Sequence, residues 1–213
     1  PDGIDPADFL GLSPAGSALF EKLNLGSYDF VLLYPTRMVR RKNIELAVKI
    51  TREMNSKGRK TCILITSPPD PHNKDSIAYY KFLKNLARDL NIENKVIFLS
   101  EQKIKGRKLR VDNRLLRDLY LFSDILLFPS KAEGFGIPIL EAGLCHLPVA
   151  CSKIAPLTEI GGKDVLYLDL NDSEKTMAEA VIRYLDGNSM LRLYKKVMRN
   201  YTWEAIFSNR IIP

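Results

Sequence analysis

Short runs of apolar residues recur along the chain without alternating with polar residues. Such runs are typical of strands buried on both faces, as in parallel sheets covered by helices. We expect strands at residues 30–35, 61–67, 95–100, 124–130, 148–152 and, less regularly, 164–170. Helical patterns occur at residues 43–58, 75–90, 113–122 and 173–185. This order predicts an α/β domain with a doubly wound, Rossmann-like parallel sheet.

The loop after the strand at 124–130 is the most informative segment for function. Its sequence KAEGFGIPILEAG, residues 131–143, places Glu133 and Glu141 on either side of a Gly-Phe-Gly turn. Pro138 suits the first turn of a helix, so we expect a helix from about Ile137. A helix N-terminus favours phosphate, and carboxylates accept hydrogen bonds from pairs of sugar hydroxyls. The segment predicts a nucleotide-sugar site, with a tight turn and a dipole-stabilised glutamate as the alternative.

The loop after the first strand, PTRMVRRKN at residues 35–43, carries four cations: Arg37, Arg40, Arg41 and Lys42. Parallel strands end at the same sheet edge, where ligands bind, so Arg37 is expected to face a diphosphate there. Arg40 and Arg41 are interpreted as solvated. The chain contains no Asp-x-Asp pair, so we expect no metal and no other cofactor. The cations and the helix end would stabilise a departing diphosphate instead.

The net charge of +7 indicates an anionic partner, with nucleic acid, an acidic membrane surface and a phosphorylated small molecule as candidates. Residues 103–114, KIKGRKLRVDNR, hold six Lys or Arg and one Asp. This segment is interpreted as a solvated loop that shapes access for an acceptor or touches a membrane. It lacks aromatic residues for base stacking, and the chain has no zinc-finger or RNA-recognition signature. We expect no nucleic-acid partner.

The three cysteines, Cys62, Cys145 and Cys151, form no C-x-x-C pair. They are interpreted as small buried apolar residues in a reducing compartment rather than as disulfide or zinc ligands. The sequence shows no bilayer-spanning apolar run and no signal peptide. We expect a cytoplasmic location, with the inner face of the membrane as a further option.

Several segments together resemble one known family. They are the opening PDGID, the R-x4-K spacing of Arg37 and Lys42, FPSKAEGFGIPILEA, LPVACS and the terminal YTWEAI. The chain resembles the C-terminal, donor-binding half of retaining glycosyltransferases of group 1, or family 4, which have the GT-B architecture. Thr36 and Asn43 stand where that family usually has glycine, and Thr36 is expected to change how closely the backbone approaches a diphosphate.

The resemblance implies a role for each matching residue. Glu141 would bind the ribose of the nucleotide, Glu133 would position the transferred hexose, and Arg37 and Lys42 would hold the diphosphate. The implied catalytic residues are Glu133, Arg37 and Lys42. The implied donor-binding residues are Arg37, Lys42, Ser130, Gly134, Phe135, Gly136, Ile137 and Glu141. The resemblance further implies a metal-independent, retaining transfer, with base recognition near residues 100–102.

The resemblance also implies a division of the chain. Residues 1–12 would be an interdomain linker, and residues 13–197 the nucleotide-sugar-binding domain. Residues 198–213 would form a helical segment that packs towards an N-terminal acceptor domain missing from this chain. We therefore expect a piece of a longer polypeptide that folds and binds donor weakly without transferring sugar.

Other functions remain open at this point. The nearest are other GT-B enzymes, namely a sugar phosphorylase or a nucleotide-sugar epimerase. A non-catalytic nucleotide-binding domain and a nucleic-acid binder are the alternatives from other classes. A dinucleotide oxidoreductase is disfavoured, because no G-x-G-x-x-G follows the first strand.

Overall fold

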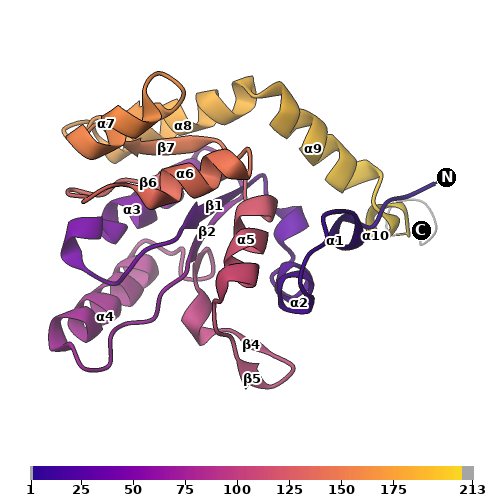
Figure 1. The fold of residues 1–213 in the computed structure, drawn as a ribbon, viewed down its shortest axis with the longest axis horizontal. Coiled ribbons are helices and arrows are strands. Elements are labelled where there is room, and N and C mark those ends of the chain that lie inside the picture. Colours follow the sequence, from indigo (N-terminus) through magenta and orange to yellow (C-terminus); the bar gives the residue numbers. More distant parts are fainter. Residues whose placement is uncertain (1, 208–213) are drawn as a thin grey trace.

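The structure is a computed structural model that describes residues 2–207. Its centre is a six-stranded sheet in the order β3-β2-β1-β6-β7-β8, and every paired neighbour runs parallel (Figure 1). The strands are β1 (Phe30–Tyr34), β2 (Thr61–Ile65), β3 (Val96–Phe98), β6 (Ile125–Phe128), β7 (Val149–Ser152) and β8 (Leu166–Leu168). A separate antiparallel hairpin consists of β4 (Lys103–Ile104) and β5 (Arg107–Lys108). The predicted fold class is confirmed.

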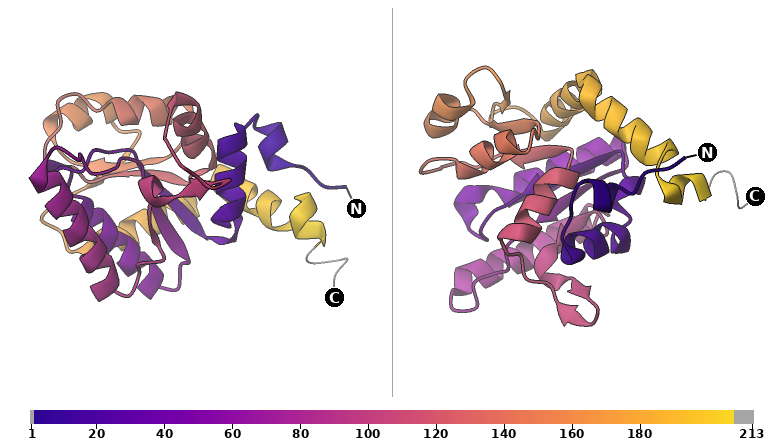
Figure 2. Two further views of the ribbon diagram at one scale, coloured as in Figure 1. Left: turned by 90° about the horizontal axis from the view of Figure 1, so that it is seen from below. Right: turned by 45° about the vertical axis from the view of Figure 1, so that its right-hand side comes forward.

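Helices cover both faces of this sheet. The α-helices of residues 2–207 are α1 (Pro6–Phe9), α2 (Pro14–Lys22), α3 (Ile44–Ser56), α4 (Lys74–Asp89), α5 (Asn113–Phe122), α6 (Ile137–Leu144), α7 (Ala155–Gly161), α8 (Glu174–Gly187), α9 (Ser189–Asn200) and α10 (Trp203–Ile206). Helices α3, α4 and α8 lie on one face, and α5, α6 and α7 lie on the other (Figure 2, left). Loops follow the strands at the carboxyl edge of the sheet.

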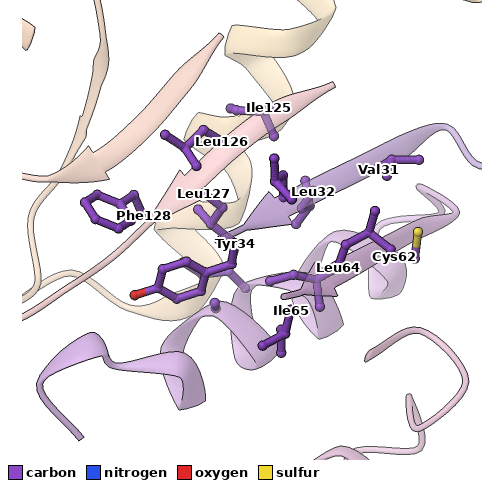
Figure 3. Close-up of a cluster of buried hydrophobic side chains, with 14 of the residues drawn as sticks. Val31, Leu32, Tyr34, Cys62, Leu64, Ile65, Ile125, Leu126, Leu127 and Phe128 are labelled. Atoms are coloured by element: carbon purple, nitrogen blue, oxygen red, sulfur yellow. The ribbon is translucent and has the colours of Figure 1, made fainter. Parts of the chain in front are cut away.

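The core lies between these layers and explains why the central strands form. Every residue of β1, β2 and β6 is buried. Figure 3 shows their side chains packed together, among them Leu32, Leu64 and Leu127. The Tyr34 and Phe128 rings meet edge to face, 5.8 Å apart. Burial of each such side chain contributes about 1.5–3 kcal/mol, so these strands form a rigid base for the loops that follow them.

Several segments differ from the sequence prediction; helix α7, for example, was not predicted. Helix α2 was not predicted, although Ser13 caps it by accepting a hydrogen bond from Gly16 N at 3.1 Å and Pro14 is its first residue. The basic segment 103–114 was interpreted as a solvated loop, but it contains the β4–β5 hairpin. Lys105 (φ 48°) and Gly106 (φ 79°) are both left-handed there, as in a two-residue type I′ turn.

The N-terminal and C-terminal segments lie side by side (Figure 1). The N–H of Ile4 donates to the carbonyl of Tyr201 at 2.9 Å, and the N–H of Trp203 donates to the carbonyl of Ile4 at 3.3 Å. The predicted linker contains the one-turn helix α1, and α9 crosses the predicted boundary at 197/198. The domain boundaries stay predictions, and residues 208–213 of the predicted C-terminal segment lie outside the described residues.

Candidate functional site

A cavity of about 650 Å³ lies at the carboxyl edge of the sheet. Residues that follow four strands line it: 35–37 and Lys42 after β1, 66–68 after β2, Ser100 after β3, and Ile137, Pro138 and Glu141 after β6. The wall is completed by residues 108–111 and Leu116. Four predicted donor-binding residues, Arg37, Lys42, Ile137 and Glu141, therefore face one cavity. Ser100, from the segment predicted to recognise the base, faces the same cavity.

The loop after β1 is fastened to the end of β6. Lys42 is the last residue of the 3-10 turn η2 (Arg40–Lys42), and its carbonyl accepts a hydrogen bond from the hydroxyl of Tyr34. Asn43 adopts a left-handed conformation (φ 53°), and its Nδ2 donates to the carbonyl of Pro129 at 3.1 Å. Asparagine tolerates this conformation better than most residues. These contacts point Lys42 into the cavity, with its ammonium 5.1 Å from the Phe128 ring centroid.

Glu133 forms ion pairs with two cations of the loop after β1. Its Oε1 lies 2.5 Å from Lys42 Nζ, and its Oε2 lies 3.6 Å from Arg41 Nη1. Arg41 also donates to the carbonyl of Ala132 at 2.9 Å. Burial lowers the pKa of Lys42, while the Glu133 carboxylate acts to raise it. Glu133 does not line the cavity itself. It is connected to the cavity through its ion pair with Lys42, which does.

Glu141 has a different partner. The hydroxyl of Tyr120 in α5 donates to Glu141 Oε2 at 2.6 Å, and Tyr120 is buried. Burial, followed by the neighbouring carboxylate, raises the pKa of Tyr120, so its hydroxyl keeps its proton. Sequence reasoning overlooked Tyr120. The sequence did contain a signal for Tyr120. The residue lies on the apolar face of α5, and a buried tyrosine hydroxyl usually needs a hydrogen-bond partner.

The N-terminal end of α6 opens towards the cavity. Gly136 precedes it with φ 106°, and a Cβ there would lie 2.8 Å from Leu157 Cδ2, so both backbone and space require glycine. Among residues 2–207, the N–H groups of Phe135, Gly136 and Ile137 donate to no protein acceptor. Unpaired N–H groups at a helix start attract anions. The expectation that a helix begins at Ile137 is confirmed.

The remaining predicted site residues lie outside the cavity wall. Ser130 is fully buried, with its Oγ 3.1 Å from the Tyr34 hydroxyl oxygen. Gly134 and Phe135 are exposed on the approach to α6. Their donor-binding roles stay predictions. Arg40 is exposed as expected, but its guanidinium lies 4.6 Å from the Tyr79 ring centroid.

The hairpin brings further positive charge to the site. Lys108 and Arg110 line the cavity beside Leu109, whose N–H donates to the carbonyl of Gln102 at 2.8 Å. Neither cation forms an ion pair within residues 2–207. Together with Arg37 and Lys42 they make the cavity strongly cationic, with Glu141 as its one acidic lining residue in the described chain. Such a cavity attracts a polyanion.

Other site types find little support in residues 2–207. No three His, Cys, Asp or Glu side chains lie close enough there to hold a metal ion. In the same stretch, no helix has both the length and the apolar character needed to cross a bilayer. Cys62, Cys145 and Cys151 are free, and burial raises the pKa of each thiol. They pack as small, protonated side chains.

Comparison with known proteins places this cavity in a familiar fold. Mannosylglucosylglycerate synthase from Petrotoga mobilis is 30% identical over 146 residues, which are 62% of this chain and 33% of that protein. The structure of sucrose-phosphate synthase from Thermosynechococcus elongatus matches with a TM-score of 0.66 and 25% identity, covering 97% of this chain and 49% of that one. Anabaena HepE, solved with UDP-glucose, matches with a TM-score of 0.65 and 20% identity over 91% of this chain and 48% of that one.

This chain spans about a third of that curated relative and about half of each solved chain. The family model described as "Glycosyl transferases group 1" matches residues 17–201, which is most of the sequence. The motifs that carried the resemblance lie largely inside this matched region. The chain belongs to the group 1 glycosyl transferases.

Proposed function

We propose that this chain is the donor-binding half of a retaining glycosyltransferase that transfers a hexose from a nucleoside diphosphate sugar without a metal ion. One observation carries the proposal: a single cavity brings together Arg37, Lys42, Glu141 and the N-terminal end of α6. Membership of the group 1 family supports sugar transfer. The similar fold of HepE, which was solved with UDP-glucose, supports a nucleotide-sugar donor.

In this proposal the cations bind the diphosphate and the acids bind hydroxyls. Arg37 can form two parallel hydrogen bonds to phosphate oxygens, and Lys42 acts as a point charge. Glu141 accepts hydrogen bonds from the ribose. Glu133 holds Lys42 in place and contacts the hexose when the donor is bound.

The chemistry follows from where charge develops. As the bond between the anomeric carbon and the diphosphate breaks, negative charge accumulates on the leaving oxygen beside Arg37, Lys42 and the N–H groups of residues 135–137. Donors fixed in advance stabilise that charge at little reorganisation cost. The leaving phosphate oxygen accepts the acceptor's proton, and the acceptor oxygen bonds to the carbon on the face that the diphosphate leaves. The configuration is therefore retained.

The proposal for the whole protein includes an N-terminal domain that binds the acceptor, in the cytoplasm or at the inner face of the membrane. On this reading, residues 1–213 alone bind donor nucleotide but do not complete the transfer. The first experiment compares nucleotides with different bases.

Isothermal titration of the purified chain with UDP, GDP and ADP tests the proposal. We expect at least one to bind, with the same affinity after addition of EDTA. Arg37→Ala and Glu141→Ala should each weaken that binding about tenfold or more, because each removes a charge-assisted hydrogen bond. Arg40→Ala is the matched control, since Arg40 lies in the same loop but not on the cavity wall. Failure of all three nucleotides to bind would refute the proposal.

A further inference from the structure

We propose that Tyr120 is a positioning residue for ribose recognition: its buried hydroxyl holds Glu141 so that the other carboxylate oxygen meets the nucleoside. This inference rests on the proposed function, because it concerns the same cavity. It assigns a role to a residue of α5, a helix that contributes none of the site residues predicted from the sequence.

The contact is specific at the atomic level. The Tyr120 hydroxyl lies 2.6 Å from Glu141 Oε2, and within residues 2–207 this is the hydroxyl's one hydrogen bond. Glu141 Oε1 accepts no hydrogen bond from the described residues, while Glu141 lines the cavity. One oxygen is therefore fixed by the protein, and the other is left for a ligand.

Tyr120 can act in this way because its own helix is held firmly. The neighbouring Asp118 is fully buried, and its Oδ2 accepts hydrogen bonds from the N–H of Ser13 at 2.8 Å and from the Ser13 hydroxyl at 2.5 Å. Leu116, one turn earlier in α5, lines the cavity. The helix thus fixes the Tyr120 ring relative to the cavity wall.

A glutamate side chain without such a partner is mobile. It has three rotatable bonds, and ordering them on ligand binding costs conformational entropy. A hydrogen bond from Tyr120 orders Glu141 before the ligand arrives, so the ligand meets a prepared acceptor. The gain in affinity therefore comes from the ribose, which Glu141 contacts, and not from the diphosphate.

Tyr120→Phe tests the inference, because it removes the hydroxyl and keeps the ring that fills the core. We would titrate the wild-type chain and the variant with the tightest-binding of UDP, GDP and ADP, and with inorganic pyrophosphate. The variant should bind the nucleoside diphosphate about tenfold more weakly and bind pyrophosphate with unchanged affinity. Tyr167→Phe is the control, since that hydroxyl donates to the carbonyl of Gly162 at 2.9 Å, away from the cavity.

A double-mutant cycle separates positioning from a structural effect. If Tyr120 acts through Glu141, the Tyr120→Phe/Glu141→Ala variant should bind the nucleoside diphosphate no more weakly than Glu141→Ala alone. Circular dichroism melting would confirm that each variant is folded. Unchanged nucleotide affinity in Tyr120→Phe, an equal loss of pyrophosphate affinity, or additive losses in the double variant would overturn the inference. A wild-type chain that binds none of the nucleotides would instead refute the proposed function itself, and this inference with it.

Discussion

The ammonium of Lys42 lies 2.5 Å from Oε1 of Glu133, although the two residues are 91 positions apart in the chain. They belong to the loops after β1 and β6, which are hydrogen-bonded neighbours in the sheet. Their side chains are only 10% and 7% exposed, so the ion pair is largely removed from water. Charges interact more strongly in such surroundings than at the surface.

The first prediction concerns the pH dependence of this pair. Burial lowers the pKa of Lys42, and the Glu133 carboxylate opposes that shift. Glu133→Gln removes the opposing charge, so the pKa of Lys42 should fall further. Diphosphate binding needs the ammonium form, so affinity should be lost as pH rises through this pKa. Titrations from about pH 7 to 10 should show the alkaline loss at lower pH in Glu133→Gln than in the wild type.

The control for that experiment is Lys42→Ala, which should bind weakly and lack the alkaline loss. An alkaline loss at the same pH in Glu133→Gln and in the wild type would show that Glu133 does not govern the charge of Lys42.

The second prediction concerns the hairpin. Lys108 and Arg110 line the cavity without acidic partners among residues 2–207. Lys108→Ala/Arg110→Ala should weaken nucleoside diphosphate binding by about two- to fivefold at low ionic strength, and by less as salt screens the charges. Lys103→Ala/Lys105→Ala makes the same change in net charge away from the cavity wall. Equal losses in both double variants would contradict a local effect.

The third prediction concerns a buried ion pair at the opposite edge of the sheet. Asp124 is 1% exposed, and its Oδ2 accepts hydrogen bonds from the Val31 N–H and the Lys195 ammonium, both at 2.6 Å. Lys195→Met should lower the free energy of unfolding by about 3–5 kcal/mol, because it leaves a buried carboxylate without its counter-ion. Urea denaturation measures this change.

Two further measurements define the effect of that pair. Burial already raises the pKa of Asp124, and loss of Lys195 should raise it further. The folded variant would then bind more protons than the unfolded chain, so its stability should fall as pH rises from about 4 towards that raised pKa. Arg59→Met breaks the exposed pair with Asp186 and should cost under about 1 kcal/mol. Equal losses in both variants would contradict the role of burial.

The fourth prediction compares two helical glycines. A Cβ on Gly16 in α2 would clash with Asp118 Oδ2, the atom that accepts both hydrogen bonds from Ser13. Gly16→Ala should therefore lower the free energy of unfolding by about 2–3 kcal/mol. A Cβ on Gly143 in α6 would meet no atom within 4 Å, and Gly143→Ala should raise stability by about 0.5–1 kcal/mol. If crowding at Gly16 were unimportant, thermal and urea unfolding would show a similar gain in stability for both variants.

The sheet is predictable from the sequence because burial on both faces leaves an apolar run as the trace of each central strand. The hairpin leaves no such trace. Its strands are cationic, and it is held by the Lys105–Gly106 turn and by the Lys22 ammonium, which donates to the carbonyl of Lys103 at 3.0 Å. A contact between segments 81 positions apart has no local signature.

Part of the site is predictable because parallel strands end at the same edge of the sheet, where ligands bind. Arg37, Lys42 and Glu141 lie in the segments that follow two such strands. Ser130 also follows a strand, but its side chain turns inward to Tyr34, and sequence alone does not reveal that direction. The pairing of Tyr120 with Glu141 depends on how α5 and α6 are rotated over the sheet. Such rotations are set by packing across the whole core.

The adjacency of β1 and β6 has a consequence for motion in this molecule. Amide hydrogens in the most buried central strands exchange with solvent only through rare, large-scale opening, whereas loops and short hairpins exchange through frequent local opening. Lys42 and Glu133 lie in loops that follow central strands, where amide exchange is expected to be slow. Lys108 and Arg110 lie at and just after the hairpin, where amide exchange is expected to be fast. We therefore expect any opening of the cavity during ligand entry and exit to involve the hairpin more than the loops after β1 and β6.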